Sequence, residues 1–255
     1  MSWNLRGSLA YVCVIAGVFH GARSAAQERA LPDVLRDSIA AYAKLTSYAD
    51  TGTVRQEVPG IVEESKFTTY FRRATRDFYF DFQTLASRDP KTGFTIDLSD
   101  NRTVIWMFNG NMQTYNFKLR THQQVTAEAQ ALQMPAYATR GTSMLIPSLL
   151  YSQSGLPGTV VQIEDAQIAG IEEINQRRCH KVVGTAVAYY KTGARTGERP
   201  VTVWIDAETR LIRRVFEDTP KSHPANSFSR LTITFEPRGN PAIEEGRFQF
   251  KPPSR

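Results

Sequence analysis

Cysteine is scarce in this sequence of 255 residues, in which only Cys13 and Cys179 occur. Cys13 lies in a segment that we expect to be removed on export, and the single remaining thiol cannot form an intramolecular disulfide. The fold must therefore be stabilised by a packed apolar core rather than by covalent cross-links. His180 follows Cys179, but neighbouring residues of a strand point to opposite faces, so we expect no thiol–imidazole dyad here.

Long hydrophobic runs are lacking as well. The apolar run Leu9–Phe19 is too short to span a bilayer as a helix, and no later segment is long enough. This run follows a basic residue and precedes the small residues Ser24-Ala25-Ala26, an order that is typical of a cleaved export signal. We therefore expect residues 1–26 to be a signal peptide, cleaved before Gln27, and residues 27–255 to form one periplasmic domain.

The sequence also lacks basic clusters, metal-ligand spacings and catalytic motifs. Its 31 Lys and Arg residues and 25 Asp and Glu residues give a net charge of +6 that is spread along the chain, which argues against nucleic-acid binding. His122, His180 and His223 are not spaced as metal ligands, and no G-x-S-x-G motif occurs. We therefore expect no metal site, no cofactor and no catalytic residue.

What the sequence does contain is a series of short strands, each with one apolar face. Val201–Asp206 alternates apolar and polar residues, Asp206 can accept backbone N–H groups in a turn, and the aliphatic residues from Leu211 predict an antiparallel return. Asn109-Gly110 predicts a second tight hairpin. Further strands are expected at 51–58, 66–73, 163–168, 173–190, 228–235 and 248–250.

Helices are predicted at two places. Apolar residues three and four positions apart predict a helix from Leu31 to Tyr48. Two shorter helical segments are predicted between Val125 and Tyr151, where Pro147 interrupts the pattern. Strands before and after this helical insert favour one continuous, strongly bent sheet over two separate domains.

The candidate ligand-binding residues come from three alternating segments and from the helical insert. We expect their apolar side chains to share one face of the sheet and to line a cavity that the insert covers. They are Phe78, Phe80, Phe82, Phe94, Ile96, Leu98, Val104, Trp106, Phe108, Met144, Leu145 and Leu149.

Several short motifs, taken in order, resemble those of the periplasmic lipoprotein-carrier superfamily (the LolA/LolB-like fold). They are Arg73 before the Phe78–Phe82 strand, Ser99-Asp100-Asn101 before the next strand, the Trp204-Ile205-Asp206 hairpin, and the closing segment 248–253. With the N-terminal helix they run over most of the chain after residue 27. The sequence thus resembles an exported relative of these carriers.

The resemblance implies an α+β fold, in which a strongly bent antiparallel sheet (a half-barrel) carries an N-terminal helix and a central helical lid. In the carriers, a hydrophobic cavity under the lid takes acyl chains, and an arginine that matches Arg73 hydrogen-bonds the lid. The implied function is non-catalytic binding of a lipid or acyl chain, with carriage of a lipid or an outer-membrane lipoprotein as one form of it. The implied partners are a lipid or an acylated protein, and a membrane protein complex of the cell envelope.

Two alternatives stay open at this point. The first is an envelope stress sensor or interaction module that binds lipid or peptide and regulates a membrane partner. The second is a hydrolase whose site the sequence motifs do not reveal.

Overall fold

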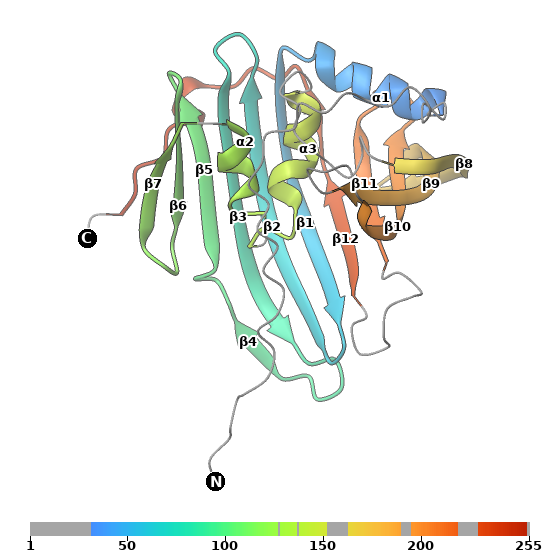
Figure 1. Cartoon of the computed structure of the whole chain (residues 1–255), viewed down its shortest axis with the longest axis horizontal. Helices are drawn as coiled ribbons and strands as arrows, with labels where there is room; N and C mark the ends of the chain where they lie inside the picture. Colours follow the sequence, from blue (N-terminus) through green and yellow to red (C-terminus); the bar gives the residue numbers. More distant parts are fainter. Residues whose placement is uncertain are drawn as a thin grey trace.

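One antiparallel sheet of 13 strands dominates the structure, a computed structural model, and this sheet curves strongly without closing into a barrel (Figure 1). The structure describes residues 32–126, 128–136, 138–151, 163–189, 195–218 and 229–253. The few helices are short, so the fold is mainly β rather than an even mixture of helix and strand.

The strands follow one another along the chain with few crossovers. Across the sheet their order is β7-β6-β5-β3-β2-β1-β12-β11-β10-β9-β8, while β4 pairs with β3 and β13 pairs with β1. Pairing of β1 with β12 therefore joins the N-terminal half of the sheet to the C-terminal half. The strands are β1 (Ser47–Val58), β2 (Ile61–Arg72), β3 (Asp77–Arg88), β4 (Thr95–Asp97), β5 (Arg102–Phe108), β6 (Asn111–Asn116), β7 (Thr121–Val125), β8 (Ile163–Ile174), β9 (Arg177–Tyr189), β10 (Arg195–Asp206), β11 (Ile212–Glu217), β12 (Arg230–Phe235) and β13 (Arg238–Gly239).

Three α-helices pack on one face of this sheet, which we call the inner face (Figure 1). They are α1 (Asp33–Lys44), α2 (Glu128–Gln133) and α3 (Thr142–Leu150), and we refer to α2 and α3 together as the lid. α1 ends before the predicted Tyr48, because Leu45 is already extended and Ser47 begins β1 by pairing with Arg72.

The main apolar core lies between the inner face and the helices. It unites buried residues of α1, α2 and α3 with inner-facing residues of strands from both halves of the sheet, including Phe80 of β3 and Ile233 of β12. Two smaller apolar clusters lie on the opposite face, which we call the outer face; one centres on Trp106 and the other on Trp204. The sheet is thus buried on both sides, and among the described residues the α-helices cover only the inner side.

Both hairpins predicted from turn residues are confirmed. Asn109 and Gly110 have φ of 51° and 75° between β5 and β6, as a two-residue turn of this kind requires. The Asp206 carboxylate oxygen Oδ1 accepts the backbone N–H groups of Glu208 at 3.0 Å and Thr209 at 2.9 Å between β10 and β11.

Two predicted strands are shortened or lost in the structure, and the strand expected at 173–190 is divided by a turn at 175–176 between β8 and β9. The segment around Ile96 forms only the three-residue β4, which pairs with the far end of β3, beyond the residues of β3 that pair with β5. Phe248 ends a 3₁₀-helix, Glu245–Phe248, rather than starting a strand. The first segment can pair only with the end of β3, and the second lies over the outer face, where Phe250 packs on Trp106.

Candidate functional site

The inner-face site is built on β3. Phe78, Phe80 and Phe82 alternate along this strand, are at most 1% exposed, and all point to the inner face. Leu145 and Leu149 of α3 are buried in the same cluster. The structure therefore brings together the phenylalanines of β3 and residues of the central helical insert, and their binding of a ligand stays a prediction.

The lid helix α3 is short, apolar and almost wholly buried. Of its nine residues only Met144 is not buried, and Met144 is half-buried against the inner-face cluster. Gly141 precedes the helix with a φ of 79°, a backbone conformation that glycine adopts without strain, and Pro147 interrupts its hydrogen bonding. A helix this short is marginal on its own, so tertiary contacts must hold it in place.

The two lid helices are tied to each other by hydroxyl groups. Ser143 donates from Oγ to the carbonyl oxygen of Leu132 in α2 at 2.8 Å, and it accepts a hydrogen bond from Thr139 Oγ1 at 2.9 Å. These hydroxyls are buried and satisfied within the lid. Buried hydrogen bonds therefore link α2 to α3.

Arg73 joins the lid to α1. Its Nη1 donates to the carbonyl oxygen of Leu150 at the end of α3 at 3.1 Å, while Nη2 and Nε donate to the carbonyl oxygens of Tyr42 at 2.9 Å and Leu45 at 2.6 Å. The contact predicted between Arg73 and the lid is present. Because the last carbonyls of a helix lack intrahelical partners and carry partial negative charge, one guanidinium satisfies the ends of two helices.

A buried polar group lies beside this contact, on the inner face under α1. Tyr48 donates its hydroxyl to Asp50 Oδ2 at 2.6 Å, and the Tyr42 ring lies 5.6 Å from the Tyr48 ring. Tyr42 in turn accepts the backbone N–H of Ile212 at 3.1 Å. Burial raises the pKa of the Asp50 carboxyl to about 6, although the Tyr48 hydroxyl favours the charged form. The inner face therefore contains a carboxyl group that gains its charge near pH 6, well above the pH at which an exposed aspartate ionises.

The residues predicted on β5 belong to the opposite face, which corrects the predicted lining. Val104 and Trp106 are buried in an outer-face cluster, and the half-buried Phe108 shares their side of the strand. Phe80 pairs with Ile105, so Ile105 rather than Trp106 shares its face. β5 is buried on both sides, and apolar alternation therefore could not reveal which set of its residues faces the lid.

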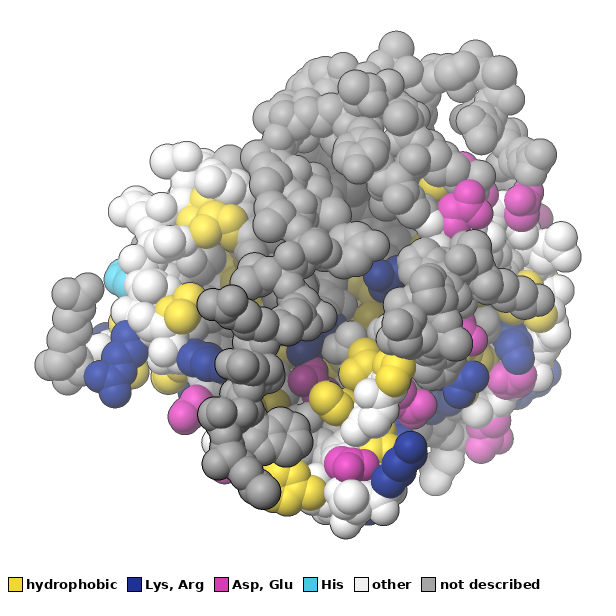
Figure 2. All heavy atoms as spheres, turned by 60° about the horizontal axis from the view of Figure 1, so that its bottom comes forward, with side chains coloured by type: hydrophobic (Ala, Val, Ile, Leu, Met, Phe, Trp, Pro, Cys, Tyr) yellow, Lys and Arg dark blue, Asp and Glu magenta, His cyan; other side chains and the backbone are white. Residues whose placement is uncertain are grey.

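Phe94, Ile96 and Leu98 lie outside both faces of the packed sheet, which is a second correction. Phe94 is 67% exposed and Ile96 is 49% exposed, and Leu98 is only half-buried. Seen from the end of the sheet where β4 lies, the described apolar side chains form separate patches among charged ones (Figure 2). These residues do not line the inner-face site because β4 projects beyond the covered part of β3.

Cys179 is fully buried in an outer-face cluster with Trp204, and burial raises the pKa of its thiol. His180 is opposite Ile205, an inner-face residue, and so points away from Cys179.

Within the described part of the chain, no three His, Cys, Asp or Glu residues are grouped to hold a metal ion. No helix among those residues is long and apolar enough to cross a membrane.

The described residues define an open, bent sheet with a short apolar lid over its inner face. The family described as "Predicted periplasmic protein (DUF2092)" matches residues 75–255, and the chain belongs to this family. No curated protein matches the chain. Two expectations stay predictions: that the chain is a relative of the lipoprotein carriers, and that a signal peptide is cleaved before Gln27.

Three solved structures illustrate what the fold is similar to. The lipoprotein LppX of Mycobacterium tuberculosis is 16% identical over 84% of this chain and 98% of its own, with a TM-score of 0.45. LprF from Mycobacterium bovis is 18% identical over 82% of this chain and 93% of its own, with a TM-score of 0.44. The MucA/MucB complex of Pseudomonas aeruginosa is 14% identical over 86% of this chain and 60% of the matched chain, with a TM-score of 0.42. These identities are too low to transfer a ligand or a partner.

Proposed function

We propose that this periplasmic protein binds a lipid or an acyl chain, without catalysis, between the inner face of its sheet and the lid. The observation that carries the proposal is the short apolar helix α3, which covers an aromatic sheet face and is tied to α1 by Arg73. In the cell envelope, such binding would serve the carriage of lipids or acylated proteins to a membrane partner.

The composition of the lid selects an apolar ligand. Burial of one large aliphatic side chain contributes about 1.5–3 kcal/mol, so moving Leu145, Ile146 and Leu149 away from the sheet into water is costly. An acyl chain that enters beneath the lid replaces this apolar contact, whereas a polar ligand does not. The lid therefore opens at acceptable cost only when an apolar molecule takes its place on β3.

Arg73 sets how firmly the lid is held. Its hydrogen bonds to Leu150, Tyr42 and Leu45 must break or rearrange before α3 can move away from α1. Hydrogen bonds to a charged group contribute about 1.5–3 kcal/mol each when well shielded, and less for a half-buried side chain such as this one. We therefore assign Arg73 the role of a latch.

The test is binding of a fluorescent fatty acid to protein stripped of bound lipid. We expect saturable binding by the wild type, and release from Arg73→Met faster by about tenfold, because one net hydrogen bond of about 1.4 kcal/mol is lost. Arg72→Met is the matched control: Arg72 is the preceding residue, but it donates to the carbonyl oxygen of Ile243 at 3.0 Å and lies over the Phe248 ring.

Two outcomes would overturn the proposal in different ways. Failure of the stripped wild type to bind any acyl probe would reject lipid binding itself. Equal release rates for Arg73→Met and Arg72→Met in folded proteins would reject the latch while leaving lipid binding in place.

A further inference from the structure

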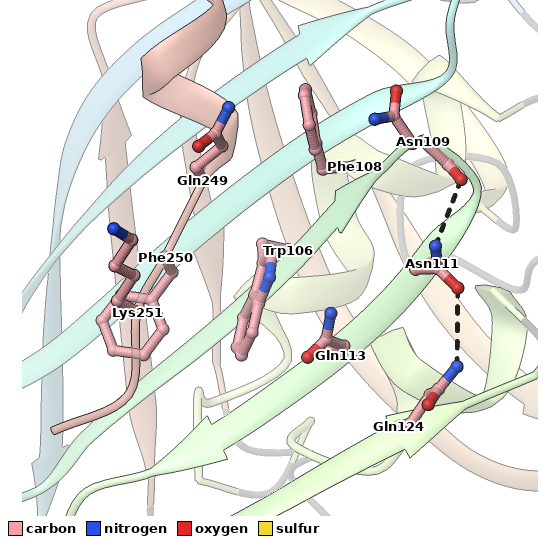
Figure 3. A pocket seen from close by; sticks show the side chains of 9 residues that line it. All are labelled: Trp106, Phe108, Asn109, Asn111, Gln113, Gln124, Gln249, Phe250 and Lys251. Atoms are coloured by element: carbon pink, nitrogen blue, oxygen red, sulfur yellow. Dashed lines mark hydrogen bonds between the residues drawn. The ribbon is translucent and has the colours of Figure 1, made fainter. Parts of the chain in front are cut away.

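A pocket on the outer face is not used by the inner-face site. It has a volume of about 320 Å³ and lies where the C-terminal segment crosses β5, β6 and β7 (Figure 3). Three aromatic side chains, five amide side chains and Lys251 line it. We propose that this pocket binds a neutral sugar ring, a function separate from lipid binding because the sheet lies between the two sites.

Strand register brings the central side chains into one row. Trp106 of β5 is opposite Gln113 of β6, and Gln113 is opposite Gln124 of β7. Phe108 and Asn111 form the next pair along the same hairpin. The row therefore presents an indole and two amides side by side, with a second aromatic–amide pair beside it.

Trp106 is held rigidly at one end of this row. The Phe250 ring lies 5.0 Å from the indole at 62°, and the His122 ring is stacked on it at 5.6 Å and 18°. Trp106 is only 4% exposed, so it offers an edge rather than a full ring face. In Figure 3 the indole nitrogen is on the side of the ring nearer Gln113, where its N–H can donate to a ligand.

The amides retain hydrogen-bonding capacity for a ligand. Gln113 Oε1 contacts His122 Nε2 at 2.8 Å, and Gln124 Nε2 donates to Asn111 Oδ1 at 3.5 Å. An amide has two donors and an acceptor with two lone pairs. One donor of Asn111 is used on the backbone carbonyl oxygen of Asn109 at 3.3 Å (Figure 3), so the second donor of Asn111, the donors of Gln113 and the acceptor of Gln124 remain available. Hydroxyl groups both donate and accept, and a ring of hydroxyls is the ligand that such a set of amides matches.

The lining disfavours other classes of ligand. An acyl chain would cover the amides without satisfying them, and a buried polar group that is left unpaired disfavours binding. A polyanion would require several cationic groups, whereas Lys251 is the single charged residue of the lining. A transition-metal ion would require imidazole or thiolate ligands, and a firmly bound Ca²⁺ or Mg²⁺ ion would require carboxylates beside the amide oxygens; the lining contains none of these groups. A neutral molecule with hydroxyl groups and an apolar ring face is what remains.

Isothermal titration calorimetry with two oligosaccharides tests the proposal. Cellotetraose presents hydroxyl groups alone, whereas chitotetraose also presents N-acetyl groups, as cell-wall glycans do. We expect saturable binding of one or both by the wild type. Affinity should fall about tenfold in Gln124→Ala and in Gln113→Ala, because each loses a hydrogen bond of about 1.4 kcal/mol.

Gln123→Ala supplies the matched control. Gln123 precedes Gln124 on β7 and is also exposed. It points to the inner face, because it pairs with Thr114, which is opposite the inner-facing Ile105. This variant should bind as the wild type does. Absence of saturable binding to both oligosaccharides would overturn the proposal, as would equal affinities of Gln123→Ala, Gln124→Ala and Gln113→Ala. Failure of lipid binding would leave the result unaffected.

Discussion

The two faces of one sheet differ in what covers them, and this difference separates two kinds of chemistry. Helices cover the inner face, where Phe78, Phe80 and Phe82 pack against α3 in a continuous apolar core. The outer face is covered only in part, by the C-terminal segment, in which Phe250 packs on Trp106. In our two proposals, the apolar inner face suits a ligand that replaces apolar contacts, whereas the open outer face with its amide groups suits a ligand that forms hydrogen bonds.

Arginines illustrate the same contrast. On the inner side, Arg73 donates to the carbonyl ends of two helices. On the outer side, Arg102 forms a bidentate ion pair with Asp81 within adjacent strands, at 2.9 and 2.6 Å, and lies over the Phe117 ring. The first arginine links the ends of two helices, and the second joins two strands that already pair through their backbones.

The largest expected effect comes from the phenylalanine at the centre of the inner face. Phe80→Ala should lower the free energy of unfolding by about 3–5 kcal/mol, because it leaves a cavity in a close-packed core. Phe94→Ala is the control and should change it by less than about 0.5 kcal/mol, since Phe94 is mostly exposed. Urea unfolding measures both. Similar losses for the two variants would mean that β4 packs against the body of the sheet.

The second prediction concerns the pH dependence of the inner face. The pKa of Asp50 is about 6 in the folded protein and 3.8 when unperturbed, so the folded state retains a proton that the unfolded state loses. Stability contributed by this carboxyl should therefore be greatest near pH 4, fall as the pH rises to 6, and level off above, with a total loss of at most about 3 kcal/mol.

Asp50→Asn tests this prediction because an amide keeps an acceptor for the Tyr48 hydroxyl and does not titrate in this range. The difference in unfolding free energy between variant and wild type should grow in favour of the variant from pH 4 to pH 7. Denaturant unfolding at a series of pH values measures it. A constant difference across the range would show that Asp50 titrates normally in the folded protein.

The features that were predictable from sequence are local. Asn109-Gly110 and Asp206 determine their turns through backbone conformation and hydrogen bonds to nearby N–H groups, and both hairpins are confirmed. The contact of Arg73 with the lid followed from the family resemblance. Its hydrogen bonds to Tyr42 and Leu45 were not predicted, since a helix end gives no sequence signal for a distant arginine.

The features that could not be predicted depend on how separate strands align. Alternation within β3 and within β5 is visible, but the register that pairs Phe80 with Ile105 is set by the whole sheet. Ile105 and Met107 were missed as inner-face residues for this reason. The outer pocket was missed because Phe250 reaches Trp106 from a segment far along the chain, which no spacing rule describes.

The smallest expected effect is that of a substitution at Ile96, at the end of the sheet where β4 lies. Ile96 was predicted to line the cavity, but its side chain is 49% exposed on β4. Ile96→Trp should therefore change neither the melting temperature nor fatty-acid binding, because surface substitutions of this kind alter stability by less than about 0.5 kcal/mol.

Met144→Trp is the variant to compare with Ile96→Trp. Met144 is half-buried in α3 against the core, so a larger ring there should compete with an acyl chain for space beneath the lid. Fluorescent fatty-acid titration of the two variants measures the contrast. Weaker binding by Ile96→Trp with unchanged binding by Met144→Trp would move the ligand from the lid to the rim of the sheet at β4.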